Sequence, residues 1–457
     1  SLSLIIPNGI WKIIWVNAYP PITIAPLSSI IALRFFGLFI VLPVISVYAL
    51  SLPGSNSTLV GIVIGGYALT QMIFQIPFGI MSDKLGRKGT IILGLLLFAI
   101  GSIVCAVSND ILLLLLGRFL QGAGAIGAVV TAMISDLVQE EKRPKAMALM
   151  GGMIAGSFAL AMIIGPTMGA ALGIHSLFWL TAALALISIF VLIKLVPNPP
   201  KIQHSYDTKT NLIPILLNSN LIKMNITNFL QKGFMTFAFM IIPIVLTKTY
   251  GWELADLYKV YLPSMIAGVL AMAPAAILAE KKGKFKEVLI VGIIFFAISY
   301  YMIGSTTSTL GFISGVVIFF IGFNMHEPIM QSLATKYAKV HQRGAVLGTF
   351  NSFGYLGTFI GGVVGGIYLD KVGLDQIANV IVIISILWAL LIVTLPNPTK
   401  MKIAYISCND ASSDNLDRLN YSTSNIDEWY INETENLIIV KYNENLTSED
   451  NIKELIK

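Results

Sequence analysis

Long apolar segments recur through most of this 457-residue chain, and they constrain the fold more than any other feature. A helix needs about 20 mostly apolar residues to cross the hydrocarbon core of a bilayer. Such segments recur from about residue 26 to residue 395, which leaves room for about twelve crossings with their loops. Only 12% of the residues are charged, about half of the roughly 25% typical of soluble domains, so water could not solvate such a chain.

Continuous apolar runs also distinguish helices from barrel strands. Lipid offers no partners to unpaired backbone groups, so spanning segments are helices or closed barrels, and barrel strands alternate apolar with polar residues. The sequence therefore predicts an all-α polytopic membrane protein. Breaks at charged residues, prolines and glycines predict crossings near residues 27–50, 58–81, 89–107, 110–138, 144–171, 175–196, 219–248, 254–279, 286–304, 309–336, 343–369 and 375–395.

Lys and Arg are distributed unequally between the two sets of loops. The loops after even-numbered crossings carry most of them, whereas the opposite loops carry little beyond Lys248, Lys259 and Lys371. Basic loops stay in the cytoplasm. We therefore expect both termini to be cytoplasmic, in a multi-pass protein of a bacterial inner membrane.

The two halves of the chain repeat each other. Pro77 and Pro274 are 197 residues apart, as are Gly86 and Gly283, and Arg143 and Arg343 are 200 residues apart. Near-equal offsets spread along the chain indicate two related six-helix halves. Parallel halves of this kind are typical of transporters that bind substrate between them near the middle of the membrane.

The repeat and the composition divide the chain into parts. Residues 26–196 and 219–396 form the two six-helix halves, with a cytoplasmic linker at residues 197–218 and a small acidic soluble domain at residues 401–457. Residues 1–25 are apolar and broken by prolines. We treat them as an unplaced N-terminal extension or a start-site artefact.

The loop between the second and third crossings contains Gly79-Ile-Met-Ser-Asp83-Lys-Leu-Gly86-Arg87-Lys88. Gly79 permits close approach of helices, and Gly86 permits a turn with positive φ. Asp83 and Arg87 can pair with each other, or with the opposite half in one conformation only, which predicts a gate. The alternative is a solvated turn whose charges only set the topology.

This segment closely resembles the loop signature of the major facilitator superfamily, G-x-L-a-D-r-x-G-r-k. The resemblance implies a twelve-helix fold of two six-helix halves. It also implies that Asp83 meets the N-terminus of the eleventh helix, where the helix dipole favours a carboxylate. Asp136, at the end of the fourth helix, would complete the cluster with Arg87.

Two further helices resemble motifs of the same superfamily. Gly117-Arg118-Phe-Leu-Gln121 resembles the arginine-bearing motif B. An arginine inside a membrane usually faces a cavity or a carboxylate, so Arg118 is a candidate for proton coupling, with snorkelling to the interface as the alternative.

The fifth helix resembles the antiporter motif C, g-x8-G-x3-G-P-x2-G-G. Its matching residues are Gly152, Gly165, Pro166 and Gly169, and two alanines replace glycines of the motif. A pliable, tightly packed helix between the halves is the implied consequence, and the motif favours export over uptake. A general stripe of small packing residues is the alternative.

Few ionisable residues lie deep in the predicted crossings. Arg34 lies in the first, and Glu327 lies in the tenth, with His326 beside it and Pro328 after it. A carboxyl group in a low-dielectric environment can exchange a proton near neutral pH. Glu327 is therefore the main candidate for proton coupling, and Arg34, Arg118 and His326 are further candidates. A structural kink or an ion pair is the alternative for Glu327.

Polar and aromatic side chains of the crossings are candidates for lining a largely apolar cavity. They are Tyr67, Gln71, Gln75, Gln121, Asn324, Gln331 and Tyr355. For each of them, a hydrogen bond that packs two helices together is the alternative.

The composition changes after Pro398. Residues 401–457 hold eleven Asp and Glu against five Lys and Arg, a net charge of −6, which leaves +12 on the rest. The segments follow in the order β-α-β-β-α, which predicts a small α+β domain, a shortened ferredoxin-like unit. Cys408 has no C-x-x-C partner, so no metal is expected. Opposite charge favours docking on the basic cytoplasmic face, and a solubilising appendage is the alternative.

These features together resemble the YajR-type branch of the major facilitator superfamily, in the drug:proton antiporter group. The resemblance implies a proton-coupled exporter of drug-like or hydrophobic small molecules that works by alternating access. The proton gradient is the expected driving force, without a cofactor. Proton-symport uptake of a small metabolite, and a transporter-like sensor that signals through the C-terminal domain, are the alternatives.

The same sequence gives little support for other functions. No nucleotide loop, metal cluster or nucleophile constellation indicates an enzyme. The expected partners are a small-molecule substrate and the lipid bilayer, with no nucleic acid. We expect the chain to be a monomer.

Overall fold

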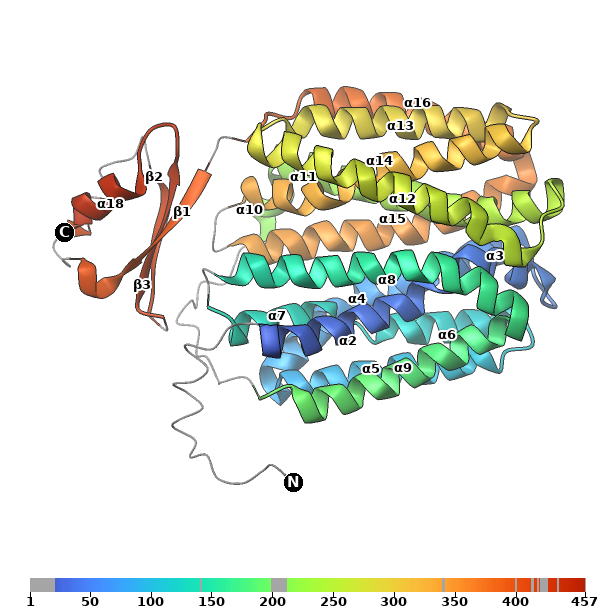
Figure 1. The fold of residues 1–457 in the computed structure, drawn as a ribbon, viewed down its shortest axis with the longest axis horizontal. Coiled ribbons are helices and arrows are strands. Elements are labelled where there is room, and N and C mark those ends of the chain that lie inside the picture. The colour runs from blue at the N-terminus through green and yellow to red at the C-terminus, as the bar shows by residue number, and fades with distance from the viewer. Residues whose placement is uncertain are drawn as a thin grey trace.

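A long bundle of helices carries a small sheet domain at one of its ends (Figure 1). The computed structural model describes residues 21–139, 142–198, 212–338, 342–398 and most of 401–456, leaving out 412–414, 417–418, 420–425 and 434. Within this part, twelve helices are long and apolar enough to cross a membrane. The predicted all-α polytopic architecture and the number of crossings are therefore confirmed.

The first half contains six crossings, two of which are interrupted. The first crossing breaks at Ile40 and Val41, just before Pro43, and the fourth breaks between Gly124 and Ile126. The helices are α2 (Pro21–Phe39), α3 (Leu42–Ser51), α4 (Ser57–Leu85), α5 (Arg87–Ala106), α6 (Ile111–Ala123), α7 (Gly127–Leu137), α8 (Arg143–Leu172) and α9 (Ile174–Leu195).

The second half repeats this arrangement after a short helix, α10 (Leu212–Leu217). Its crossings are α11 (Ser219–Ile244), α12 (Tyr258–Ala276), α13 (Phe285–Ser305), α14 (Thr309–Lys336), α15 (Arg343–Val372) and α16 (Leu374–Val393). Single π-helical turns at Val245–Thr249 and Ile277–Lys281 extend α11 and α12.

The internal repeat extends to the backbone at the tight turns. Gly86 and Gly283, 197 residues apart, have φ of +95° and +70°, and Gly173 and Gly373, 200 residues apart, both have φ of +83°. Residues that carry a side chain rarely adopt positive φ, so glycine is the residue that allows these short turns. The chain therefore reverses direction at equivalent glycines in the two halves.

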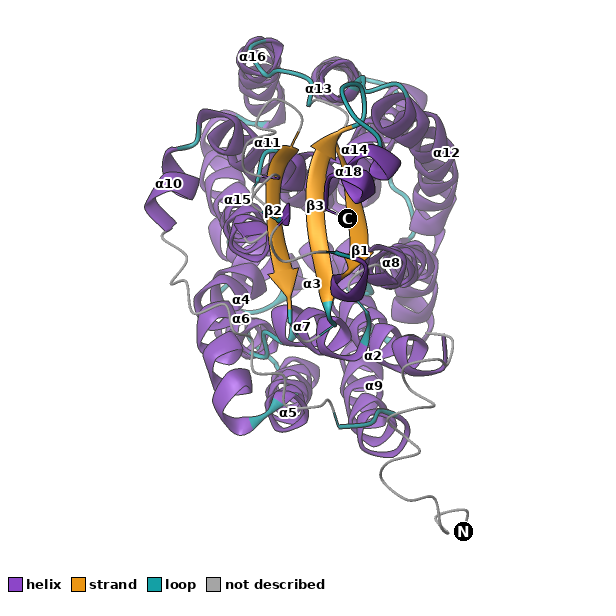
Figure 2. Ribbon diagram, turned by 90° about the vertical axis from the view of Figure 1, so that its left-hand side faces the viewer, coloured by secondary structure: helices purple, strands orange, loops and turns teal. Residues whose placement is uncertain are grey.

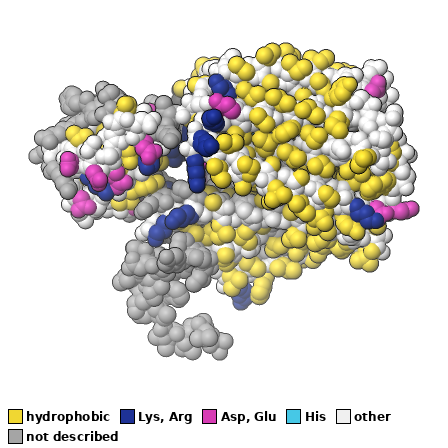
Figure 3. Space-filling view, turned by 45° about the horizontal axis from the view of Figure 1, so that its top comes forward, with side chains coloured by type: hydrophobic (Ala, Val, Ile, Leu, Met, Phe, Trp, Pro, Cys, Tyr) yellow, Lys and Arg dark blue, Asp and Glu magenta, His cyan; other side chains and the backbone are white. Residues whose placement is uncertain are grey.

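The flank of the bundle is apolar, and its charges gather near one end. Large apolar side chains such as Ile76, Leu270 and Leu387 are exposed, and Figure 3 shows hydrophobic side chains covering the side of the bundle. Lys and Arg side chains gather beside the sheet domain (Figure 3). A continuous apolar band is what lipid chains require of a membrane protein.

The C-terminal domain is a three-stranded antiparallel sheet with a helix. Strands β1 (Met401–Ser407), β2 (Ile426–Asn432) and β3 (Leu437–Asn443) lie in the order β1-β3-β2, and α18 (Glu449–Ile456) follows. Ile452 and Ile456 of α18 pack into one apolar core with the sheet. The predicted α+β domain is confirmed. The helix predicted between its first two strands falls largely outside the described residues.

Two names describe the ends of the bundle. The C-domain end is the end beside the sheet domain, where α4 ends at Leu85 and α8 begins at Arg143. The far end is the opposite one, where α4 begins at Ser57 and α15 ends at Val372.

Candidate functional site

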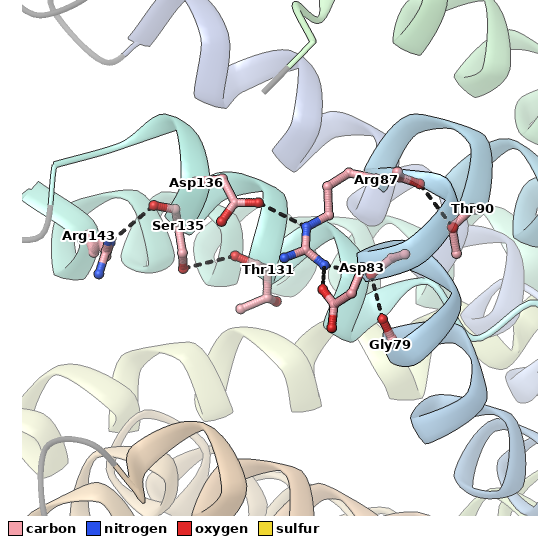
Figure 4. A network of polar contacts seen from close by, with 10 residues as sticks. Gly79, Asp83, Arg87, Thr90, Thr131, Ser135, Asp136 and Arg143 are labelled. Atoms are coloured by element: carbon pink, nitrogen blue, oxygen red, sulfur yellow. Dashed lines mark hydrogen bonds and ion pairs between the residues drawn. The ribbon is translucent and has the colours of Figure 1, made fainter. Parts of the chain in front are cut away.

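The turn between α4 and α5 places a guanidinium between two carboxylates (Figure 4). Gly86 turns the chain, and Arg87 opens α5. Arg87 donates from Nη1 to Asp83 Oδ1 at 2.6 Å and from Nε to Asp136 Oδ2 at 2.9 Å. It also donates from Nη1 to Ser82 Oγ at 2.6 Å. The structure thus brings the three charged residues predicted for the gate into one cluster.

The Asp83 carboxylate does not cap the eleventh crossing in this conformation. Its side chain is 67% exposed, and among the described residues its ion-pair partner is Arg87. Lys88 is partly exposed in the first turn of α5. The contact between Asp83 and the N-terminus of α15 that the resemblance implied is therefore not formed here.

Helices α4 and α15, from different halves, touch at the far end and separate toward the C-domain end. A Cβ built on Gly61 would lie 1.9 Å from the carbonyl oxygen of Gly362. Gly79 follows Gly61 by 18 residues, about five helical turns, so it lies on the same face of α4. Nothing lies within 4 Å of a Cβ built on Gly79 or on Gly344, which precedes Gly362 by 18 residues. The two halves therefore diverge toward the C-domain end.

Two hydrogen bonds join the halves along α4 and α15. Ser57 Oγ donates to Asp370 Oδ1 at 2.6 Å at the far end, and Gln71 Nε2 donates to the hydroxyl of Tyr355 at 2.7 Å farther along. Sequence reasoning missed the first pair because Ser57 and Asp370 are 313 residues apart and belong to no motif. The halves are thus held together by close packing and polar contacts at the far end.

The second half carries a counterpart of this cluster in which one position has the opposite charge. Glu280, equivalent to Asp83 by the repeat, lies 3.3 Å from the Nζ of Lys336 and accepts a hydrogen bond from Ser332. Lys336 stands 200 residues after Asp136 and so takes its place. The offset of 197 residues identifies Glu280 as the equivalent of Asp83, whereas only the structure shows that Lys336 is its ion-pair partner.

Glu327 forms an ion pair with a cation of the neighbouring helix. Lys232 Nζ of α11 lies 2.5 Å from Glu327 Oε1 of α14, and Gln231 Nε2 donates to the same oxygen at 3.1 Å. The side chains of Lys232 and Glu327 are 24% and 35% exposed. The alternative of an ion pair, left open by the sequence, is therefore what the structure has, and the carboxylate stays accessible.

His326 faces away from this ion pair. It is fully buried, its Nε2 lies 2.9 Å from the carbonyl oxygen of Leu289 in α13, and its ring packs edge-on against Phe296 and Trp388. Successive residues of a helix point about 100° apart. The structure thus separates His326 from Glu327, although the two are neighbours in sequence.

Arg34 lies in α2 with little compensation for its charge. It is 1% exposed, its Nη2 donates to Gln71 Oε1 at 3.3 Å, and Nε and Nη1 are buried without a hydrogen-bond partner among the described residues. The guanidinium lies 5.8 Å from the ring centre of Phe35 and 5.3 Å from that of Phe98. Through Gln71, Arg34 is connected to Tyr355 of the other half.

Arg118 is buried with better hydrogen bonding. Its Nε donates to the carbonyl of Val63 at 3.0 Å, and its Nη1 donates to Gln121 Oε1 at 2.8 Å. Gln121 donates in turn to Ser102 Oγ at 2.9 Å. Both side chains are fully buried, so Arg118 and Gln121 tie α6 to α4 and α5 and do not line an open cavity in this conformation.

Helix α8 packs closely at one end and lies open at the other. A Cβ built on Gly165 would lie 2.2 Å from the carbonyl oxygen of Ile40, at the break in the first crossing, and one on Gly169 would lie 2.9 Å from Ile174. Pro166 lies within the helix, and Gly152 has nothing within 4 Å. Two of the motif glycines therefore permit close packing, whereas Gly152 faces open space.

The remaining cavity candidates fall into different environments. Tyr67 is 7% exposed and lies 4.8 Å from the Arg118 guanidinium. Asn324 donates to a carbonyl of its own helix, and Gln331 is exposed. Gln75 is partly buried, and its Oε1 has no hydrogen-bond partner among the described residues.

The C-terminal domain contacts both halves at the C-domain end. Glu435, in the turn between β2 and β3, lies 3.6 Å from Arg143 at the start of α8. Lys441 of β3 donates to the carbonyl of Ala338, just beyond α14, at 3.3 Å, and pairs with Asp427 at 2.8 Å. In Figure 2 the strands run across the end of the bundle from the α14 side to the α7 side.

Comparison with known proteins shows the family of the chain. The family model of the Major Facilitator Superfamily matches residues 27–362. Inner membrane transport protein YajR of Escherichia coli (strain K12) is 34% identical, over 94% of this chain and 96% of the relative. Multidrug resistance protein 2 of Bacillus subtilis (strain 168) is 27% identical, over 78% and 90% of the two chains.

A solved structure gives the same fold. The crystal structure of the nucleoside transporter NupG has a TM-score of 0.67 to this chain at 14% identity, over 81% of this chain and 98% of that one. Two six-helix halves, the cluster of Asp83, Arg87 and Asp136, and the matched family model lead to one conclusion. The chain belongs to the Major Facilitator Superfamily and is a multi-pass membrane transporter, not an enzyme.

Proposed function

We propose that this transporter is a proton-coupled exporter of drug-like or hydrophobic small molecules that works by alternating access. The observation that carries the proposal is the divergence of α4 and α15. The halves meet at Gly61 and Gly362 and separate at Gly79 and Gly344. A substrate site between the halves would be reached from the C-domain end in this conformation and from the far end in the alternative one.

The distribution of charge supports a cytoplasmic C-domain end. Lys and Arg gather there (Figure 3), and basic loops stay on the cytoplasmic side. Both termini would then be cytoplasmic, and the conformation would be open to the cytoplasm. An exporter must load its substrate from that side, or from the adjoining leaflet, in such a conformation.

Two findings support proton-coupled export. Multidrug resistance protein 2 is named for drug resistance, and the close packing of Gly165 against Ile40 fits the antiporter motif of the fifth crossing. Glu327 is the proposed proton carrier because its carboxylate is accessible and has a partner, Lys232, that could hold it charged. Protonation would release Lys232, and that change of partners would couple the proton to the movement of the halves.

The cluster of Asp83, Arg87 and Asp136, called the gate cluster here, would close the C-domain end in the opposite conformation. Asp83 is exposed here and paired only with Arg87 among the described residues. When the C-domain end closes, Asp83 would meet the N-terminus of α15, where the unpaired backbone N–H groups favour an anion. While the C-domain end is open, Arg87, which is itself paired with Asp136, would hold the Asp83 carboxylate in place.

We also propose that the acidic C-terminal domain docks on the basic end of the bundle and regulates closure. Its contacts reach both halves, through Glu435 to Arg143 and through Lys441 to Ala338. A domain attached to both halves would resist any movement that changes their spacing. Ordinary exposed ion pairs contribute only about 0.2–1 kcal/mol, so the docked domain would bias the movement without blocking it.

Transport by everted membrane vesicles tests the proposal. With ethidium as the probe, we expect accumulation that depends on the proton gradient and is lost in Glu327→Gln. Glu253→Gln, which neutralises an exposed carboxylate before α12, serves as the control and should transport normally. Gradient-driven transport that persists in Glu327→Gln would exclude Glu327 as the proton carrier, and accumulation only in right-side-out vesicles would indicate uptake.

A further inference from the structure

We propose that Arg34 receives the carboxylate of an aromatic organic acid, so that the substrates of this transporter include hydrophobic organic anions. The inference rests on the proposed transport function and names a substrate class for it. The site consists of Arg34 on α2, Gln71 on α4 and Tyr355 on α15, with aromatic walls. Its residues come from both halves, and transporters of this class bind their substrates between the two halves.

The first argument is the unmet charge of Arg34. Three lysine or arginine side chains are buried among the described residues: Arg34, Arg118 and Lys441. Lys441 pairs with Asp427, and Arg118 donates to two backbone carbonyls and to Gln121. Arg34 has one amide oxygen at 3.3 Å and two nitrogens without a protein partner among the described residues.

A buried guanidinium in this state is costly. Burial of a charge is tolerated where the charge is paired and hydrogen-bonded, and arginines within membranes normally face a partner or a cavity. The planar guanidinium presents its donors in a fork that matches the two oxygens of a carboxylate. Each fork includes Nη2 together with either Nε or Nη1, so a carboxylate that takes the place of Gln71 at Nη2 would accept two parallel hydrogen bonds from Arg34.

The second argument is the apolar surroundings of the guanidinium. The ring centres of Phe35 and Phe98 lie 5.8 and 5.3 Å from it. Phe35, Phe39 and Tyr355 pack partly buried against a small cluster that contains Phe98 and Tyr67. Walls of this kind accept an aromatic body, and the arginine fixes its acidic group. A small inorganic anion would leave these walls without a partner.

The third argument is a polar path toward the open end. Gln75 lies one helical turn beyond Gln71 on α4, in the direction of the C-domain end, and its Oε1 has no partner among the described residues. Gln71 connects Arg34 to Tyr355 across the halves. A carboxylate that displaces Gln71 from Arg34 would also change this contact between the halves, which would link binding to their movement.

Binding to the purified full-length protein in detergent tests the inference without requiring a gradient or a direction of transport. The probes are 2-naphthoate and its neutral isostere 2-naphthamide, at pH 7.5, where a carboxyl group with a pKa of about 4 is ionised. Ligand-dependent shifts of the melting temperature give both dissociation constants. We expect the wild-type protein to bind naphthoate at least about tenfold more tightly than naphthamide.

The variants assign the preference to one residue. Arg34→Gln should weaken naphthoate binding about tenfold or more and leave naphthamide unchanged, and Arg34→Lys should fall between, because it keeps the charge and loses the fork. Lys194→Gln removes an exposed cation from the last turn of α9 and should bind both probes normally.

Two results would overturn the inference. One is wild-type protein that binds naphthoate no better than naphthamide, which needs no variant and so does not depend on the folding of Arg34→Gln. The other is Arg34→Gln that keeps the wild-type preference for naphthoate. Neither result bears on proton-driven transport of ethidium, so failure of this inference and failure of the proposed function remain distinguishable.

Discussion

Gly61 of α4 and Gly362 of α15 meet backbone to backbone, so closely that a Cβ on either would fall about 2 Å from the carbonyl oxygen of the other, at 1.9 and 2.2 Å. No rotamer change could relieve such a contact, because the obstructing atoms belong to the main chain. The far end is therefore closed by a surface that only glycine allows. The same faces of the two helices carry Gly79 and Gly344 at the C-domain end, where nothing lies within 4 Å of the added Cβ.

Substitution of these glycines should shift the protein between its two conformations. Gly61→Ala forces α4 and α15 apart at the far end, and overpacking of this kind typically costs about 1–3 kcal/mol. We expect it to depopulate the observed conformation. Gly79→Ala adds the same methyl group to the same face where there is space, so it should leave this conformation intact and hinder closure of the C-domain end.

Distances between spin labels at Ser51 and Lys371 can measure this shift. Both residues are exposed and lie at the far end, because Ser51 ends α3 just before α4 begins and Lys371 stands next to the last residue of α15. The natural Cys105 and Cys408 would first be replaced by serine. The distance should lengthen in Gly61→Ala and stay at the wild-type value in Gly79→Ala. An identical distance distribution in the two variants would show that the glycine contact does not hold the far end closed.

The two carboxylates beside Arg87 should differ in their contribution to stability. Asp136 is 10% exposed, whereas Asp83 is 67% exposed. Exposed ion pairs contribute about 0.2–1 kcal/mol, and removal of one partner costs more as the pair becomes buried. We expect Asp136→Asn to lower the melting temperature of the purified protein clearly more than Asp83→Asn.

The comparison with transport then separates stability from gating. Asp83→Asn should impair transport despite its small effect on the melting temperature, since its proposed contact forms only when the C-domain end closes. Equal losses of stability in the two variants would contradict the assigned difference in burial. Normal transport by a stable Asp83→Asn protein would remove Asp83 from the gate.

The fold was predictable from sequence because lipid leaves few alternatives. Long apolar runs must be helices, and the near-equal spacings of Pro77, Gly86 and Arg143 from their counterparts indicate related halves. The pairing of Asp83 with Arg87 was predictable because the two residues are four positions apart, on either side of the turn at Gly86. Asp136 was placed with them through the resemblance to a family.

The contacts of the buried polar residues depend on which side of each helix faces which neighbour. Glu327 and His326 are adjacent in sequence, yet one pairs with Lys232 and the other packs on α13. No pattern in the sequence set the rotation of α14, because this helix carries apolar residues on every side. The conformational state was also beyond prediction, since the same glycines must pack in one state and separate in the other.

The ion pair of Glu280 and Lys336 in the second half can be tested by exchanging its charges. Glu280 and Lys336 are 39% and 31% exposed at 3.3 Å, so their pairing should contribute at most about 1 kcal/mol. Glu280→Lys and Lys336→Glu should each lower the melting temperature slightly, because each places like charges together. The double variant restores opposite charges and should recover most of the loss. Additive losses in the double variant would show that the two side chains do not interact.

The proposed docking of the C-terminal domain would depend in part on the contact between Arg143 and Glu435. This pair lies at 3.6 Å between partly buried side chains, 27% and 19% exposed. Glu435→Arg would oppose two cations at the interface. We expect a larger fraction of undocked protein, and salt should reduce the difference from wild type, since screening acts over about 8–10 Å at moderate ionic strength.

Spin labels at Lys84 of the bundle and Asn445 of the C-terminal domain, both exposed, can follow docking. In Glu435→Arg the distance distribution should broaden toward longer values, and Arg143→Glu combined with it should restore the shorter distance. Glu444→Arg is the matched control, because it makes the same change of charge at a residue that pairs with Lys402 within the domain. If Glu444→Arg undocks the domain as effectively as Glu435→Arg, net charge alone would account for docking. Rescue by the double variant, with a docked control, would instead assign docking to this contact.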